Sequence, residues 1–262
     1  MFRDNRLKRK LSAGETAHGC WVFLEGGDGV EILSLVGFDA LIVDHEHIGA
    51  DFKTLIAQMR AAQATDTTML LRVPSDDPVY ISRALDAGIE GIIVPTVETA
   101  EQLRQIIATC QYRPHGGKRG VGYPESRAAD WSMAELDYPK LYRDRLAIGV
   151  LIETRKGVEN IDEILAVEGL DFVMIGTGDL AADLVDDFED LAAYGSYDNA
   201  ELDRLVATLE EKVNASPVAL AGVVRSPEKA KALAARGYDF VTLTADIWLL
   251  IDGARRALEA AR

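Results

Sequence analysis

The 262-residue sequence predicts a closed (β/α)₈ TIM barrel, and three observations support this prediction. Eight short apolar runs recur along the chain, amphipathic segments separate them, and the runs are near-continuous rather than alternating. Parallel strands that are buried on both faces have such continuous apolar runs. Because an α/β barrel of ~200–250 residues commonly forms one domain, we expect a single domain over residues 1–262.

The expected elements follow from the same pattern. Asp51 and the Asp76-Asp77-Pro78 run predict helix starts, and Gly88 and Gly237 predict helix ends just before a strand. The expected strands are Gly19–Leu24, Ala40–Asp44, Thr68–Val73, Gly91–Val97, Ala147–Glu153, Phe172–Gly176, Val218–Val224 and Phe240–Thr244. The expected helices include Asp51–Ala64, Pro78–Ala87, Thr99–Gln111, Asn199–Ala215 and Pro227–Arg236.

An open, doubly wound sheet is the alternative architecture. Its usual nucleotide motifs are missing, since no Gly-x-Gly-x-x-Gly follows the first run and no Walker loop occurs. The Gly26–Gly29 turn leaves a phosphate cradle open as a minor alternative. The count of eight apolar runs favours the closed barrel. The longest irregular stretches, Pro114–Ser132 and Asp183–Asp198, are expected to follow strand ends and cover the active site.

The composition excludes several classes of function. Lys and Arg number 28 against 43 Asp and Glu, a net charge of −15, which disfavours nucleic acid and anionic membranes as partners. No run approaches the ~20 apolar residues of a membrane helix. The basic start Met1–Leu11 has no apolar region after it, so we expect a solvated helix rather than a secretory signal. Cys20 and Cys110 are not expected to form a disulfide, and a cytoplasmic location fits.

Polar residues close several of the apolar runs. In a barrel of this kind the catalytic side chains lie at the C-terminal ends of the strands. Adjacent strand tips are ~4.8 Å apart, so two carboxylates on neighbouring strands can share a cation. Oxygen ligands of this kind suit Mg²⁺ or Mn²⁺, with Co²⁺ as a further candidate. The candidate residues are Asp44, His45, Glu46 and His47 after strand two, Arg72 on strand three, Glu153 on strand five, and Thr177, Gly178 and Asp179 after strand six.

Each of these residues also has a plainer interpretation. Glu153 and Asp179 are the expected metal ligands, although acids also commonly begin helices. His47 could be a general base, a metal ligand with His45, or a surface histidine. Asp44 is placed to orient the His47 ring, while His45 is expected to point elsewhere. Arg72 needs an anionic partner, either a substrate carboxylate or oxyanion, or a nearby acid.

The sequence resembles the HpcH/HpaI class II aldolases, a family of metal-dependent 2-oxo acid aldolases. The likeness runs over nearly the whole chain. It rests on Gly37–Asp39, Ile42–His47, Leu71–Pro74, Asp77-Pro78, Leu85–Gly88, Ile93–Pro95, Arg119–Gly122, Ile152–Arg155, Ile175-Gly176 and Gly178–Leu180.

The resemblance implies a role for each site residue. Glu153 and Asp179 would hold the divalent metal, and His47 with Asp44 would be the acid/base pair. Arg72 would steady the enolate of pyruvate or hydroxypyruvate. The amides of Thr177 and Gly178 would seat the substrate carboxylate, and Trp21 would lie near them. Three positions depart from the family pattern: His45 for Gly, Leu151 for Gln, and Thr177-Gly178 for Pro-Ala.

The expected activity is the making or cleaving of 4-hydroxy-2-oxo acids from a small 2-oxo acid and an aldehyde. No lysine ends a strand at the site, which argues against a Schiff-base aldolase. A lyase acting on a CoA thioester, similar to the citrate lyase β subunits, and a non-catalytic ligand-binding barrel are the alternatives.

The resemblance also implies assembly into a homo-oligomer, a hexamer in the family, with the last helix packed on a neighbour. Ile247–Leu258 is apolar enough to do so. Asp86 ends the helix after strand three, so it should lie at the bottom of its own barrel. It could assist catalysis only across a subunit contact, and a solvated helix-end acid is the plainer interpretation.

Overall fold

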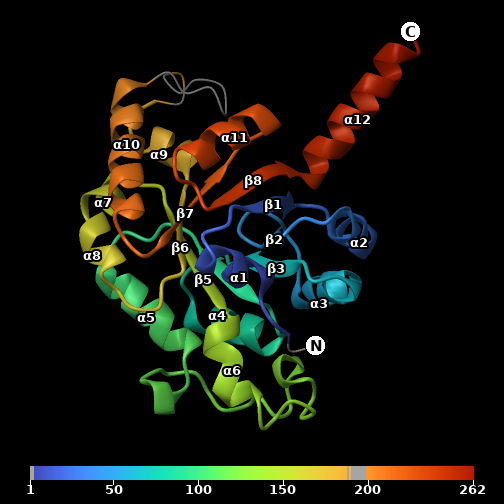
Figure 1. Cartoon of the computed structure of the whole chain (residues 1–262), viewed down its shortest axis with the longest axis vertical. Helices are drawn as coiled ribbons and strands as arrows, with labels where there is room; N and C mark the ends of the chain where they lie inside the picture. The colour runs from blue at the N-terminus through green and yellow to red at the C-terminus, as the bar shows by residue number, and fades with distance from the viewer. Residues whose placement is uncertain (1–2, 188, 190–198) are drawn as a thin grey trace.

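The computed structural model describes residues 3–187, 189 and 199–262 and contains the predicted barrel. Its eight strands pair in the closed order β1 to β8, each parallel to its neighbours, with helices around them (Figure 1). The closure of β8 on β1 confirms the barrel over the open sheet. The strands are β1 Ala17–Val22, β2 Ala40–Asp44, β3 Thr68–Arg72, β4 Gly91–Val94, β5 Ala147–Ile152, β6 Phe172–Ile175, β7 Ala219–Val223 and β8 Phe240–Ala245.

The helices begin where the sequence provides caps. Asp51, Asp77 and Thr99 each accept a backbone N–H from the first turn of the helix that follows, which satisfies a donor that the helix itself cannot. The helices are α1 Arg6–Ser12, α2 Gly27–Val36, α3 Phe52–Ala61, α4 Pro78–Asp86, α5 Ala100–Cys110, α6 Tyr138–Arg145, α7 Arg155–Glu159, α8 Ile161–Leu165, α9 Thr177–Ala182, α10 Ala200–Asn214, α11 Pro227–Ala235 and α12 Asp246–Ala260; short 3₁₀ turns cover Ala62–Ala64, Arg113–His115 and Arg127–Ala129.

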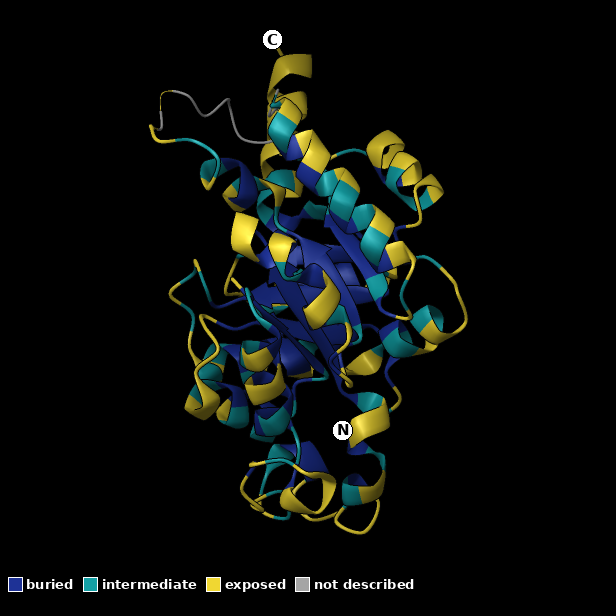
Figure 2. Cartoon of the chain, turned by 90° about the vertical axis from the view of Figure 1, so that its left-hand side faces the viewer, coloured by how far each residue is buried: buried dark blue, intermediate teal, exposed yellow. Residues whose placement is uncertain are grey.

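The strands carry two layers of core, as the continuous apolar runs predict. One layer fills the barrel and the other lies between the strands and the surrounding helices, and both leave the strands buried (Figure 2). Inside the barrel, the rings of Phe172 and Phe240 meet edge to face at 5.6 Å. Gly149 makes room for them, since a Cβ there would lie 2.2 Å from the Phe172 ring.

The N-terminal helix is not the solvated basic helix that the sequence predicts. Arg6 and Lys10 both pair with the carboxylate of Asp39, at 2.7 and 2.9 Å, and Lys8 pairs with Asp171 at 2.9 Å. Leu7, fully buried, packs into the inner core. The helix therefore closes the bottom of the barrel, because its basic side chains meet acids at the strand starts.

Two other expectations about local structure are corrected. Strand β1 runs from Ala17 to Val22, two residues earlier than expected, and the glycine-rich Gly26–Gly29 segment enters α2 instead of forming a separate loop. Asp28 lies in the first turn of α2, where a carboxylate is favourable at the positive end of the helix dipole. The position suited to a phosphate therefore already carries a negative side chain.

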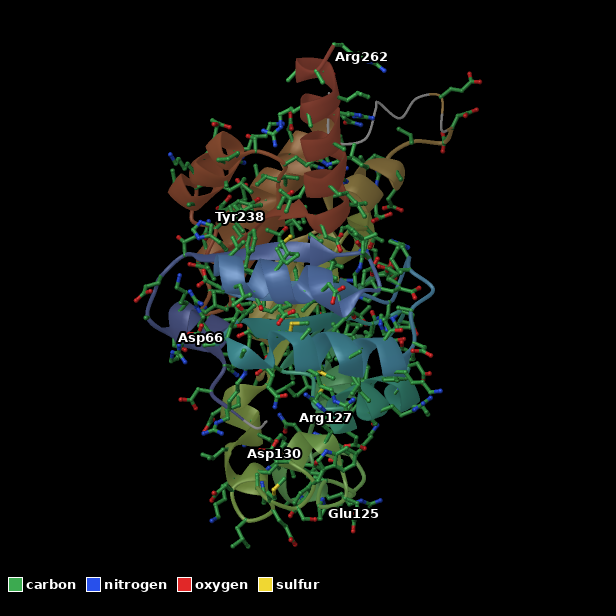
Figure 3. The ribbon with its side chains drawn as sticks, turned by 90° about the vertical axis from the view of Figure 1, so that its right-hand side faces the viewer. Asp66, Glu125, Arg127, Asp130, Tyr238 and Arg262 are labelled. Atoms are coloured by element: carbon green, nitrogen blue, oxygen red, sulfur yellow. The ribbon has the colours of Figure 1, made fainter. Side chains whose placement is uncertain are left out.

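The long segment Pro114–Ser132 was expected to cover the active site, but it lies at the opposite end of the barrel. It follows α5, which runs back toward the strand starts, and Arg127 donates to the carbonyl of Ala87 just before β4. Figure 3 shows Glu125, Arg127 and Asp130 at the end of the molecule away from Arg262. Asp183–Asp198 is the second segment that was expected to cover the active site, and its residues 188 and 190–198 lie outside the described residues.

The cysteines and the helices bear on two expectations drawn from the amino-acid composition. Cys20 and Cys110 are free and buried, and burial raises the pKa of each thiol to about 12. Within the described ranges, no helix combines the length and apolar character that crossing a bilayer demands.

Candidate active site

A cavity at the C-terminal ends of the strands gathers most of the predicted site residues. Its volume is about 90 Å³, and its walls come from β1, β3, β5, β6, β7 and the start of α12. This is the end where barrel enzymes carry their chemistry. The lining residues are Trp21, Phe23, Arg72, Leu151, Glu153, Ile175, Gly176, Thr177, Gly178, Asp179, Val223 and Trp248.

Glu153 is the buried acid of this cavity, with 4 % of its surface exposed. Its Oε1 accepts the backbone N–H of Thr96 at 2.7 Å and the Thr96 hydroxyl at 3.0 Å. Its Oε2 faces Gly176, where a Cβ would lie 2.5 Å away and collide with it. One oxygen is thus held by hydrogen bonds from Thr96, and the absence of a side chain at Gly176 leaves room for the other oxygen.

Asp179 approaches Glu153 from the first turn of α9. The pairing of Ile152 with Ile175 brings the ends of β5 and β6 side by side, which sets the two acids at one rim. Burial, and then the charges of Asp179 and Glu46, raise the pKa of Glu153 to about 7, while the Thr96 hydrogen bonds act in the opposite direction. Two carboxylates that disfavour each other's charge in a partly buried cavity form a fitting site for a divalent cation.

The set of side chains that could bind a metal in this cavity is small. Among residues 3–187, 189 and 199–262, no group of three or more His, Cys, Asp and Glu side chains is arranged to hold a metal. Glu153 and Asp179, the two ligands predicted from the sequence, would leave positions for water and substrate oxygens. The alternative site built on His45 and His47 is not formed, because the His45 ring turns away to Tyr80, with Nδ1 2.7 Å from its hydroxyl.

Arg72 crosses the floor of the cavity. Its Nε donates to Asp44 Oδ1 at 2.8 Å and its Nη1 lies 3.0 Å from Glu46 Oε2. The guanidinium also lies 4.7 Å from the centre of the Trp21 ring, and the Trp21 indole N–H donates to Thr242. The nearby acids considered from the sequence are thus partners of Arg72, and they hold a guanidinium that also lines the cavity.

His47 stands at the rim with 60 % of its side chain exposed. Asp44 does not orient its ring as expected. The Asp44 carboxylate instead accepts the backbone N–H groups of Glu46 and His47, at 3.0 and 3.4 Å, because the chain curls tightly after β2. The imidazole Nε2 lies 3.5 Å from Glu46 Oε2. Glu46, not Asp44, is the acid that faces the imidazole.

Several residues at the site could not be assigned a role from the sequence. Glu46 bridges Arg72 and His47, and its position between two histidines is the signal that could have indicated this. Thr96 has a left-handed backbone, φ 51°, and no sequence pattern announces this in a non-glycine residue. Phe23 and Trp248 come from opposite ends of the chain, and only the closure of the barrel brings them together.

Asp86 lies away from this cavity, at the C-terminal end of α4, as expected. Its carboxylate pairs with Arg119 Nη2 at 2.6 Å, and the Arg119 guanidinium is buried between Tyr112 and Tyr138. The Asp86 side chain is 40 % exposed. Asp86 is therefore a paired and partly exposed acid at the end of its helix, outside the cavity of its own barrel.

A barrel with two acids, an arginine and a rim histidine at its mouth defines a class of enzyme, the aldolase-type carbon–carbon lyases, and the comparisons with known proteins agree. The HpcH/HpaI aldolase/citrate lyase family model matches residues 17–253. This chain belongs to that family.

Similar proteins over nearly the full length support the assignment. The hydroxypyruvate/pyruvate aldolase of Chromohalobacter salexigens is 32% identical over 246 residues, covering 94% of this chain and 93% of the relative. The 2-keto-3-deoxy-L-rhamnonate aldolase of Escherichia coli K12 is 32% identical and covers 95% and 90%. A solved HpcH/HpaI family protein from Burkholderia cenocepacia has a TM-score of 0.90 at 28% identity, covering 98% and 99% of the two chains. A citrate lyase β subunit from M. tuberculosis shares only the fold, with a TM-score of 0.54 at 18% identity.

Proposed function

We propose that this aldolase is metal-dependent and joins pyruvate or hydroxypyruvate to an aldehyde, or cleaves the 4-hydroxy-2-oxo acid product. The observation that carries the proposal is the arrangement of Glu153 in the cavity lining. One of its oxygens is fixed by Thr96, the other lies against Gly176, and the charge of Asp179 is close enough to raise its pKa.

Glu153 and Asp179 are the residues that would hold the metal. Oxygen ligands favour Mg²⁺ or Mn²⁺, with Co²⁺ as a substitute. When bound, such an ion polarises the 2-oxo and carboxylate oxygens of the substrate and so acidifies its C3 protons. The citrate lyase β subunit from M. tuberculosis was solved in complex with oxaloacetate and magnesium, and the ion in that protein is consistent with this choice.

Arg72, with the first turn of α9, would bind the 2-oxo acid. The guanidinium is held by Asp44 and Glu46 and supported by the Trp21 ring, so it can donate to the oxygen that gains charge as the enolate forms. The backbone amides of Thr177 and Gly178 open α9 and would donate to the substrate carboxylate. Trp21 would contribute to binding through Arg72, whose guanidinium lies over the Trp21 ring.

His47 would move the proton of the C4 hydroxyl, accepting it in cleavage and returning it in synthesis. Its ring is exposed at the rim, and Glu46 Oε2 lies 3.5 Å from Nε2. Asp44 acts on the backbone, because its bonds to the Glu46 and His47 amides fix the turn that carries the histidine.

A homo-oligomer, a hexamer by family resemblance, is part of the proposal. Helix α12 projects from the barrel (Figure 1), and it exposes Leu249, Leu250, Ile251 and Leu258. Apolar side chains of this size are seldom left in water along a whole helix, so packing on a second copy would bury them. Such an assembly would also allow Asp86, paired with Arg119, to approach a neighbour's site.

The activity test combines pyruvate or hydroxypyruvate with a set of aldehydes in the presence of Mg²⁺ or Mn²⁺. Formation of 4-hydroxy-2-oxo acids should stop in excess chelator and return on adding the metal. Full activity in chelator, or inactivation by borohydride in the presence of pyruvate, would contradict the metal-dependent mechanism.

A further inference from the structure

The cavity at the strand ends is lined by two kinds of residue. Arg72, Glu153 and Asp179 are the residues that the proposed function assigns to the metal and the 2-oxo acid. Large apolar side chains also line it, from the ends of β1, β5 and β7 and from α12. We call these four residues the apolar wall: Phe23, Leu151, Val223 and Trp248.

The wall continues from the floor of the cavity to its rim. The Phe23 ring stacks on Trp21, with centroids 6.0 Å apart and planes 6° from parallel, and it meets Trp248 at 6.5 Å. Trp21 in turn lies under Arg72. A molecule bound to Arg72 by one end would therefore extend its other end along Phe23 and Trp248.

One buried carboxylate holds both aromatic residues in place. Asp246, with 8 % of its surface exposed, accepts the backbone N–H of Phe23 and of Leu24, at 3.1 and 2.9 Å. The same carboxylate accepts the N–H of Ile247 at 2.7 Å, at the start of α12, one residue before Trp248. The Arg225 guanidinium lies 3.6 Å from the centre of the Trp248 ring and supports it. The wall is therefore built into the fold rather than formed by loose side chains.

The wall offers little to a polar substrate tail. Its single polar side-chain group is the indole N–H of Trp248, since Phe23, Leu151 and Val223 have none. Hydroxyls or a carboxylate packed against Phe23, Leu151 and Val223 would lose hydration without gaining a hydrogen-bond partner from those side chains. Apolar atoms in the same place would gain from leaving water.

We propose that the second substrate is an aldehyde with an uncharged aliphatic or aromatic tail, and that Phe23 and Trp248 select it. This inference rests on the proposed aldolase function. The new bond joins C3 of the 2-oxo acid to the aldehyde carbon. C3 loses one proton, the aldehyde oxygen gains one as its π electrons become a lone pair, and no oxidant or reductant is needed.

The test compares two aldehydes of equal chain length, butanal and succinic semialdehyde, which differ in a terminal methyl against a carboxylate. With pyruvate and Mn²⁺, kcat/KM for butanal should exceed that for succinic semialdehyde by about 10–100-fold. Equal values, or a preference for succinic semialdehyde, would overturn the inference. Exchange of the pyruvate C3 protons, measured on the same sample, separates the two proposals: its absence overturns the aldolase function itself, and with it the inference.

Two variants test whether the apolar wall selects the aldehyde. Trp248→Ala should reduce the butanal preference about tenfold, and Val223→Lys, which adds a cation to the wall, should shift the preference toward succinic semialdehyde. Trp131→Ala is the matched control, because Trp131 is 60 % exposed on the segment between α5 and α6, at the strand starts. A ratio unchanged in both Trp248→Ala and Val223→Lys would contradict the role of the wall, since a general loss of structure lowers both activities together.

Discussion

Thr96 donates two hydrogen bonds to a single oxygen of Glu153, one from its backbone N–H and one from its hydroxyl, at 2.7 and 3.0 Å. The backbone at Thr96 is left-handed, φ 51°, a conformation that costs a β-branched residue free energy. The strain directs both donors at the same atom. Glu153 is thereby fixed in orientation while its second oxygen stays available.

The first prediction concerns this pair. Thr96→Gly keeps the left-handed backbone and the N–H but removes the hydroxyl, so the affinity for Mn²⁺ should fall about tenfold, as is typical when the partner of a metal ligand is lost. Thr96→Ser retains the hydroxyl and should bind Mn²⁺ almost as the parent does. Titration of free Mn²⁺ by electron paramagnetic resonance measures this without turnover. Equal affinity of the parent and the glycine variant would show that the hydroxyl does not position Glu153.

The second prediction separates His47 from Arg72. Loss of CO₂ from oxaloacetate gives the same enolate as aldol cleavage but requires no base for a hydroxyl proton. His47→Ala should therefore lose about 10²–10⁴-fold in aldol cleavage and keep much of any oxaloacetate decarboxylation. Arg72→Lys should lose both, since one ammonium cannot reproduce the contacts to Asp44 and Glu46 and still reach the substrate.

Steady-state assays of both reactions on metal-replete protein measure this difference. His18→Ala serves as the control, because His18 is the second residue of β1, at the other end of the barrel and near Asp39. Equal losses of cleavage and decarboxylation in His47→Ala would mean that His47 acts on the enolate or the metal instead.

The third prediction concerns pH and His45. Its ring is buried between Phe52 and Tyr80, and burial lowers its pKa, against the opposing charges of Asp44 and Asp51. Below pH ~6.5 the unfolded chain takes up a proton at this histidine that the folded chain does not. The free energy of unfolding therefore falls as pH falls, by at most about 1.4 kcal/mol per pH unit from this group.

His45→Phe removes that contribution, so its free energy of unfolding should decline less than the parent's between pH 6.5 and 5. Urea unfolding in chelator at several pH values gives the comparison. Parallel pH dependences of the two proteins would show that His45 titrates in the fold as it does in the unfolded chain.

The fourth prediction concerns α12. If its apolar side chains pack on a second copy, Leu250→Asp with Ile251→Asp should dissociate the oligomer, seen as a lower molar mass in light scattering. Arg255→Ser with Glu259→Ser changes the same helix but keeps its apolar residues, so this variant should stay assembled. A parent protein that is already monomeric at micromolar concentration would contradict the assembly.

The barrel was predictable because each strand is buried on both faces and so must be apolar throughout. The expected strand tips also placed Glu153, Asp179 and Arg72 together, since the register of parallel strands brings their ends to one rim. The predicted position of Pro114–Ser132 was wrong because the length of a segment does not show at which end of the barrel the segment lies. Its place in the chain does show this, because a segment that follows a helix lies at the end where the strands start.

Other features depend on the folded backbone and could not be predicted. The Asp44 carboxylate was expected at the His47 ring, but a tight turn presents two backbone N–H groups first. Phe23 and Trp248 are 225 residues apart (248 − 23), and their contact needs the pairing of Trp21 with Ala245 that closes the barrel.

In the proposed mechanism, Glu153 and Asp179 hold a metal that makes the C3 protons of pyruvate exchangeable. Proton NMR of pyruvate in D₂O with this protein measures that step without any aldehyde. We predict loss of the C3 methyl signal with Mg²⁺ present, no loss beyond the buffer rate in excess chelator, and none in metal-supplemented Glu153→Gln or Asp179→Asn. Exchange that continues in chelator, or in both variants, would contradict the account.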